Sequence, residues 1–188
     1  MPDKTYNTVI IGAGIIGTSI AYHLAKRGAT GIAVLEKEIN PGMGSTAKAA
    51  GGIRAQFGSE INVELSKHSI PAFENFSEEM DVETDFFQVG YLWLATREEE
   101  METFRKNVAM QRAHELDVKL ITPDEIARIA PYVKKDDLLG GTFHARDGYA
   151  PPADYVMGYH KKSKEAGVDF HLGCEVSGFD GNSIQTSV

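Results

Sequence analysis

The chain has 188 residues, of which 42% are hydrophobic and 24% charged, and this composition is typical of a globular protein and unlike a disordered or fibrous chain. It carries 27 acidic residues against 19 lysines and arginines, and the formal net charge of −8 argues against nonspecific nucleic-acid binding, which needs clustered cations. No apolar run reaches the roughly 20 residues that cross a bilayer, no signal-peptide core follows Met1, and the single cysteine, Cys174, excludes an internal disulfide. We therefore expect a cytoplasmic protein without a membrane span.

The first 36 residues predict a β-α-β unit. Residues 7–11 are a short apolar, β-branched run of the kind found in buried strands. Residues 15–27 carry apolar side chains four positions apart, which predicts a helix with one face against a sheet. Residues 32–36 predict a second buried strand. The connection between two parallel strands of this kind is expected to be right-handed.

The rest of the chain leaves this pattern and then returns to it. Residues 40–52 are mostly small, and small residues permit close approach of the backbone to a flat ligand, although a flexible linker has the same composition. The elements expected after them are a helix over 59–78 with a break near Pro71, a strand over 86–95, a helix to about 116 that begins at a capping box of Thr96 and Glu99, a helix over 123–130, a strand over 141–146, a helix over 153–166, and strands over 168–172 and 184–188.

This order of elements predicts an α/β fold with an insertion. We expect a GxGxxG, Rossmann-like dinucleotide-binding domain built from residues 1–85 and 147–188, with an α+β substrate domain inserted at 86–146. The strand predicted over 184–188 has no continuation, and no helix follows to cover its sheet. We therefore expect the chain to be truncated and the dinucleotide-binding domain to be incomplete.

A glycine motif joins the first predicted strand to the first helix. Residues 12–17, GAGIIG, match G-x-G-x-x-G. Gly12 suits the tight turn, Gly14 lets the backbone approach a pyrophosphate, and Gly17 permits close packing of helix and strand. The helix start offers unpaired N–H groups to phosphates. Glu36 ends the second strand, where an acid can accept hydrogen bonds from ribose hydroxyls.

The motif leaves alternatives open. A glycine-rich turn followed by a surface glutamate has the same pattern without any nucleotide. Glu36 disfavours a 2′-phosphorylated nucleotide, because its carboxylate repels the phosphate. The glycines and the acid together do not separate NAD from FAD, although the inserted segment favours FAD because NAD-binding domains usually continue as an uninterrupted β-α-β-α-β run.

Four segments of the chain resemble a known family. Residues 9–17 and 34–37 resemble the N-terminus of the FAD-dependent amine oxidoreductases of the D-amino-acid oxidase superfamily. Residues 51–57 and 167–176 narrow the resemblance to the β subunits of sarcosine oxidase and dye-linked proline dehydrogenase. The resemblance runs along essentially the whole chain and corresponds to the N-terminal half of these longer proteins.

The resemblance implies a set of FAD-binding residues. Glu36 holds the adenosine ribose, Ser45 and Thr46 lie at the pyrophosphate, residues 48–52 pass beside the isoalloxazine, and the Val176 backbone meets the adenine edge. For Ser45 and Thr46 the alternative is simple helix capping. The full expected set is Gly12, Gly14, Ile15, Ile16, Gly17, Glu36, Lys37, Ser45, Thr46, Lys48, Gly51, Gly52 and Val176, with FAD bound non-covalently in this segment.

Arg54 is the expected substrate-binding residue. The resemblance pairs it with the substrate carboxylate, and a guanidinium fork suits bidentate carboxylate binding. The alternative is a surface salt bridge with Glu60 or a neighbouring acid. Tyr91 and Trp93 are candidates for lining a substrate pocket, with core packing as their alternative.

Two further features limit the chemistry. The six histidines show no metal-ligand spacing, so each is expected on the surface or in packing, and no metal is expected. Sarcosine oxidase β subunits of the heterotetrameric type carry a histidine that tethers FMN near the position of residue 146, but residues 147–153 here contain none. We therefore expect no covalent FMN.

These observations predict an FAD-dependent oxidoreductase that oxidises a secondary or tertiary amino acid, such as sarcosine or proline, by hydride transfer to the flavin. An electron acceptor or a partner subunit is expected beside the amino-acid substrate, and the catalytic residue is not identified. The alternatives are a flavin-binding subunit or fragment without turnover, and an NAD-dependent dehydrogenase. The 188 residues alone are expected to be inactive.

Overall fold

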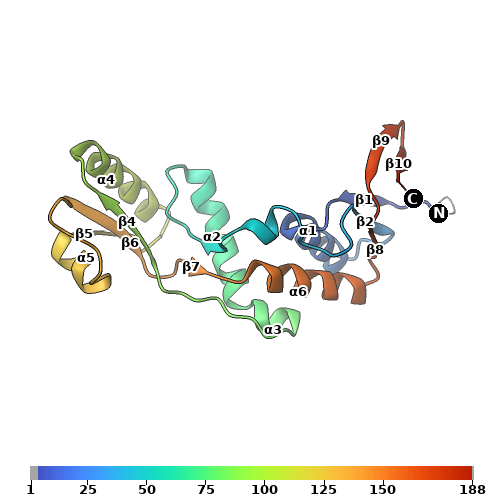
Figure 1. The fold of residues 1–188 in the computed structure, drawn as a ribbon, viewed down its shortest axis with the longest axis horizontal. Coiled ribbons are helices and arrows are strands. Elements are labelled where there is room, and N and C mark those ends of the chain that lie inside the picture. The colour runs from blue at the N-terminus through green and yellow to red at the C-terminus, as the bar shows by residue number, and fades with distance from the viewer. Residues whose placement is uncertain (1–3, 188) are drawn as a thin grey trace. The chain divides into compact units, whose positions relative to one another are not determined.

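The computed structural model describes residues 4–187, and their contacts divide the chain into two compact units (Figure 1). The first unit comprises Met1–Gly51, Phe76–Asp85 and Pro151–Val188, and the second comprises Gly52–Asn75 and Phe86–Ala150. The predicted domains differ from these units, because residues 52–75 and 147–150 pack in the second unit. The short strands β3 (Gly52–Ile53) and β7 (Gly148–Tyr149) pair with each other and hold these segments there.

The first unit is built on a parallel three-stranded sheet. Its strands lie in the order β1 (Thr8–Ile11), β2 (Ile32–Glu36) and β8 (Asp169–Leu172), so the returning strand lies beside β2. The helix α1 (Ile15–Lys26) joins β1 to β2 and buries Ala21 against Ile32, Val34 and Val168. The predicted β-α-β unit is therefore confirmed.

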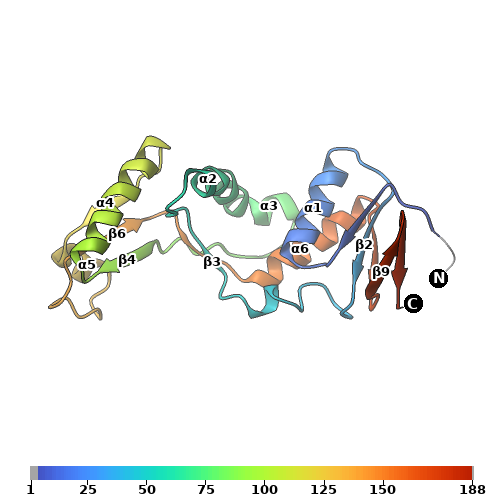
Figure 2. The same ribbon diagram turned by 90° about the horizontal axis from the view of Figure 1, so that it is seen from above.

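A second helix, α6 (Pro152–Glu165), lies alongside α1 in the first unit (Figure 2). The rings of Tyr22 and Tyr159 meet between these helices, with centroids 5.5 Å apart. The short helix α3 (Phe76–Met80) packs closely on α6 at Gly158. A Cβ there would lie only 2.7 Å from the Phe76 ring, so the close approach needs a residue without a side chain. Burial raises the pKa of Tyr155, whose ring lies 4.1 Å from that of Phe76, to about 12, so this phenol stays neutral.

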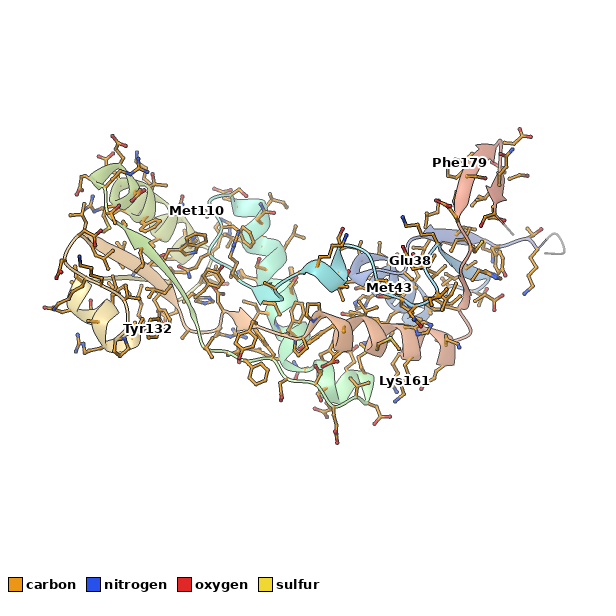
Figure 3. The ribbon with its side chains drawn as sticks, viewed as in Figure 1. Glu38, Met43, Met110, Tyr132, Lys161 and Phe179 are labelled. Carbon is orange, nitrogen blue, oxygen red and sulfur yellow. The ribbon has the colours of Figure 1, made fainter. Side chains whose placement is uncertain are left out.

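The last strands of the chain form a separate hairpin. Strand β9 (Val176–Asp180) pairs antiparallel with β10 (Ser183–Thr186), and exposed Phe179 extends from β9 (Figure 3). The strand predicted over 184–188 thus corresponds to β10 and pairs with β9; Val188 lies outside the described residues.

The second unit contains an antiparallel sheet in the order β4 (Tyr91–Ala95), β6 (Gly140–His144) and β5 (Lys119–Ile121). Helices α4 (Glu98–Ala113) and α5 (Pro123–Ile129) lie on its opposite faces (Figure 1). A Cβ on Gly140 would meet Met101 of α4, whereas one on Gly141 would meet Ile126 of α5, and adjacent strand residues face opposite ways. The strand predicted over 86–95 begins only at Tyr91.

The helix predicted over 59–78 is two helices. Helix α2 (Glu60–Glu74) contains Pro71 in its last turn and ends at Asn75. Asn75 closes it, because both its N–H and its Nδ2 donate to the Pro71 carbonyl, at 3.1 and 2.7 Å. The break near Pro71 is thus confirmed, although it lies four residues beyond the proline.

The predicted capping box at Thr96 and Glu99 is wrong by one residue. Helix α4 begins at Glu98, with Arg97 before it. The Glu100 carboxylate accepts hydrogen bonds from the N–H groups of Thr96 and Arg97, at 3.0 and 3.2 Å. An acid one residue later than predicted therefore caps this helix.

We expect Gly141→Ala to lower the free energy of unfolding by about 1–3 kcal/mol, the usual cost of overpacking. A Cβ at this position would lie 2.3 Å from the Trp93 carbonyl oxygen, so β4 and β6 would have to separate. Denaturant unfolding of the variant measures the loss. Gly58→Ala is the matched control, since its Cβ would meet only the side chain of Asn107, at 3.4 Å. Equal stability of the two variants would contradict this account of the sheet.

Candidate functional site

The glycine motif forms the turn between β1 and α1. Gly12 has a φ of +99°, which favours glycine, and its N–H donates to the Leu35 carbonyl at 2.7 Å. A Cβ on Gly17 would lie 1.9 Å from the Gly12 carbonyl oxygen, so the helix packs against the turn only because residue 17 has no side chain. The structure thus gives these two glycines the steric roles that the sequence motif predicts.

The first turn of α1 has backbone N–H groups that donate to no carbonyl of the helix. The first intrahelical bond of this turn runs from the Thr18 N–H to the Gly14 carbonyl at 3.0 Å, so the helix does not use the N–H groups of Ile15, Ile16 and Gly17. Ile15 N–H donates to Thr46 Oγ1 at 3.1 Å. The positive end of the helix and these donors together suit an anionic ligand.

Glu36 lies beside the same turn. Its Oε2 accepts from the Ala13 N–H at 2.7 Å, and its Oε1 accepts from the Glu38 N–H at 2.9 Å. An ionised carboxylate offers about four lone-pair positions, so each oxygen can accept one further donor. The half-buried carboxylate therefore orders the turn and keeps acceptor positions for further donors.

The segment after β2 brings Thr46 to the turn but leaves its neighbours exposed. Thr46 is buried at the start of the 3-10 helix η1 (Thr46–Lys48), and a Cβ on Gly14 would lie 3.2 Å from its hydroxyl. Ser45 precedes η1, but its side chain makes no capping bond there. Of the two hydroxyls, only that of Thr46 serves as a cap, and it caps α1. Ser45 and Lys48 are exposed.

The segment before β9 also reaches the end of β2. Gly173 N–H donates to the Glu38 carbonyl at 2.9 Å (Glu38 is labelled in Figure 3), and Cys174 N–H donates to the Glu36 carbonyl at 2.8 Å. Val176, two residues further on, is half-buried, and Lys37 is exposed. The first unit thus gathers the glycine turn, Glu36, Thr46 and the approach to Val176 at the carboxyl end of its sheet, which is where doubly wound folds bind ligands.

Arg54, in the second unit, lies among aromatic rings. Its guanidinium carbon is 4.9 Å from the ring centre of Phe57, 5.8 Å from that of Tyr91 and 5.3 Å from that of Trp93. No ion pair joins Arg54 to Glu60 or to another acid within residues 4–187, and its buried Nε has no hydrogen-bond partner there. The ring faces attract the cation while leaving its N–H donors for an anion.

Three polar residues that sequence reasoning missed lie next to Arg54 in this unit. Asp147 is fully buried, and its Oδ1 accepts from the Ala55 N–H at 2.8 Å and lies 2.7 Å from His144 Nδ1. Gln56 is buried as well and donates to Asp147 Oδ2 at 3.3 Å. His144 was expected to be a surface or packing residue. Only the turn signal Asp147-Gly148 marks this cluster in the sequence, and it does not reveal the partners.

A cavity of about 190 Å³ adjoins this cluster on the side of the sheet that α4 covers. Its lining residues are Gln56, Trp93, Phe104, Asn107, Val108, Gln111 and Thr142. Trp93 thus borders both the cavity and the guanidinium of Arg54. Core packing was the alternative for Trp93, but the indole remains 37% exposed.

The described part of the chain contains no group of three or more His, Cys, Asp or Glu side chains that could hold a metal ion. Likewise, none of the helices within residues 4–187 is long and apolar enough to span a membrane.

Comparison with known proteins gives a consistent result. The model of the DAO family, described as FAD dependent oxidoreductase, matches residues 7–188. Sarcosine oxidase subunit beta from Arthrobacter sp is 31% identical over 97% of this chain and 47% of its own length. Mitochondrial dimethylglycine dehydrogenase from Rattus norvegicus is 34% identical over 86% of this chain and 19% of its own length.

A solved structure agrees with these matches. The crystal structure of L-proline dehydrogenase from P. horikoshii superposes with a TM-score of 0.89 at 37% identity, covering 98% of this chain and 48% of that one. The chain therefore spans about half the length of this structure and of the sarcosine oxidase subunit, and less of the dimethylglycine dehydrogenase. The expected α/β fold with a GxGxxG domain is confirmed.

We expect Glu36→Gln to weaken FAD binding by about 1–3 kcal/mol, because one acceptor of the carboxylate becomes a donor. Titration of the apoprotein with FAD, followed by flavin fluorescence, measures the affinity. Glu38→Gln is the matched control, since Glu38 contacts this part of the unit through its backbone carbonyl, which accepts from the Gly173 N–H. Unchanged FAD affinity in a folded Glu36→Gln variant would remove Glu36 from the site.

Proposed function

We propose that this protein oxidises a secondary or tertiary amino acid with FAD. The basis is that the chain belongs to the DAO family of FAD-dependent oxidoreductases. Sarcosine and proline are the substrates that we expect. The observation that carries this proposal is Arg54, a cation among three aromatic rings with no acidic partner within the described residues.

The residues of the first unit fit the adenosine and pyrophosphate parts of FAD. The N–H groups at the start of α1, with the Thr46 hydroxyl beside them, suit the pyrophosphate, and the free acceptor positions of Glu36 suit the ribose hydroxyls. We place Lys37, Ser45, Lys48, Gly51, Gly52 and Val176 along the rest of the cofactor. FAD is expected to be held non-covalently here, with no covalent FMN, since residues 147–153 contain no histidine.

Bound FAD supplies an acceptor for a hydride equivalent from the carbon next to the substrate nitrogen. The role we assign to this chain is to bind and orient the substrate. Arg54 would hold the carboxylate through two N–H donors, and a two-point contact fixes the direction of the substrate as well as its place. The rings of Tyr91 and Trp93 would offer apolar contact to an N-methyl group or a pyrrolidine ring.

Two alternatives differ in their support. An NAD-dependent dehydrogenase is disfavoured by the family match. A flavin-binding subunit without turnover of its own stays open, and one relative is named as a subunit, which favours a partner subunit or a separate electron acceptor for this protein too. The cytoplasmic location stays a prediction, since another relative is named mitochondrial.

We expect Arg54→Lys, in the intact protein, to raise KM for sarcosine or proline roughly tenfold, because a point charge replaces a two-pronged donor. Flavin content should stay at the wild-type value, since no FAD contact is assigned to Arg54. Steady-state assays with an artificial electron acceptor and the flavin absorbance of the purified variant measure these quantities. Wild-type KM for every amino acid that is oxidised would exclude Arg54 from the substrate site.

A further inference from the structure

The geometry points to Asp147 as a positioning residue for Arg54. We infer that its buried carboxylate fixes the backbone and side chain that directly follow Arg54, and so determines where the guanidinium is presented. The inference deepens the proposed function and rests on the assignment of Arg54 to the substrate carboxylate. Asp147 itself touches no substrate in this account.

The contacts of Asp147 converge on the two residues after Arg54. Oδ1 accepts from the Ala55 N–H at 2.8 Å, and Oδ2 accepts from Gln56 Nε2 at 3.3 Å. His144 Nδ1 lies 2.7 Å from Oδ1 and fills a further acceptor position. One carboxylate thus binds a main-chain group and a side-chain group of consecutive residues, which restrains both the position and the direction of the segment.

Gln56 extends this restraint to the sheet beneath Arg54. Its Nε2 also donates to the Tyr91 carbonyl at 2.7 Å, and its Oε1 accepts from the Thr142 hydroxyl at 2.7 Å. The amide therefore has its donor and acceptor ends fixed on two neighbouring strands. Tyr91 and Trp93, whose rings face Arg54, lie on one of these strands, so the guanidinium and its rings are held in one frame.

The turn that carries Asp147 is itself held in place. Arg146 donates from Nε and one terminal nitrogen to the two oxygens of Glu74, at 3.0 and 2.6 Å, and this bidentate bond lowers the pKa of Glu74. Gln88 bridges the same pair, donating to Glu74 at 2.8 Å and to the Arg146 carbonyl at 3.0 Å. These bonds join the turn that carries Asp147 to the last residue of α2.

Burial of this carboxylate has no clear benefit for stability alone. Asp147 is 0% exposed, and removing a carboxylate from water costs several kcal/mol that its hydrogen bonds repay only with good geometry. Apolar residues of similar volume often stabilise such a site equally well. A positioning role explains why three donors meet one carboxylate beside Arg54.

The kinetic test uses Asp147→Asn in the intact protein. We expect KM for the amino acid that it oxidises to rise roughly three- to thirtyfold, the range for residues that act through a network, while kcat and flavin content change less than about twofold. Thr142→Val provides a milder variant that removes the hydrogen bond to Gln56 Oε1 and leaves those of Nε2, with Thr142→Ser expected to restore KM. Ser66→Ala, which removes a buried hydroxyl that donates to the Asn62 carbonyl within α2, is the matched control.

The same substitution in an Arg54→Lys background shows whether the effect passes through Arg54. In that background we expect Asp147→Asn to change KM less than about twofold, because the guanidinium that Asp147 positions has been replaced. Equal effects in both backgrounds, or loss of kcat and flavin at unchanged KM, would contradict positioning and indicate a purely structural residue.

A readout without activity separates this inference from the proposed function. Hydrogen exchange of the Ala55 amide should accelerate in Asp147→Asn and stay unchanged in Ser66→Ala. An unchanged Ala55 exchange rate in Asp147→Asn would overturn the inference whatever the substrate. Faster Ala55 exchange would show that Asp147 restrains the segment. If Arg54→Lys nevertheless had wild-type KM, Arg54 would not be the carboxylate-binding residue, and both the proposed function and the positioning of Arg54 for substrate would be rejected.

Discussion

A buried carboxylate hydrogen-bonded to one backbone N–H and to neighbouring side chains is the interaction on which the polar part of the second unit depends. Asp147 is fully buried, accepts from the Ala55 N–H and from Gln56, and lies 2.7 Å from His144 Nδ1. An unpaired buried carboxylate is costly, so these donors are required once Asp147 is present, and they in turn order the segment that they belong to. The position of Arg54 follows from this constraint.

The first unit uses the same principle at its own turn. Glu36 accepts from the N–H groups of Ala13 and Glu38, and so joins the glycine turn to the end of the strand β2. The difference lies in exposure: Glu36 is half-buried and keeps acceptor positions toward solvent, whereas Asp147 has none. A partly exposed carboxylate can order a turn and still bind a ligand, whereas the acceptor positions of Asp147 face its neighbours in the protein.

Local patterns in the sequence predicted much of the fold. The apolar strands, the helix stripe and the spacing of glycines in residues 12–17 depend on residues close in sequence, and they predicted the β-α-β unit. The boundaries that failed depend on details of a few hydrogen bonds, such as Glu100 rather than Glu99 at the start of α4. The compact units differ from the predicted domains where β3 meets β7, because that pairing joins residues almost one hundred positions apart.

The candidate site divides in the same way. Glu36 and the glycines carry a local signal, and Arg54 became a candidate through resemblance to a family. His144 and Asp147 are three residues apart, but the turn signal there does not reveal Gln56, which reaches Asp147 and Thr142 from 91 and 86 positions away in sequence. A lone buried aspartate after a strand looks like a turn residue until its partners are known.

We propose that FAD bound to this protein accepts a hydride equivalent from an amino acid held by its carboxylate. The most direct measurement is anaerobic mixing of the purified, FAD-loaded intact protein with sarcosine or L-proline, and in parallel with dimethylamine or pyrrolidine, which lack the carboxylate. The account predicts saturable loss of oxidised flavin absorbance with at least one of the amino acids, and a far slower loss with its carboxylate-free analogue. Equal rates for an amino acid and its analogue, or no flavin reduction by either amino acid, would contradict it.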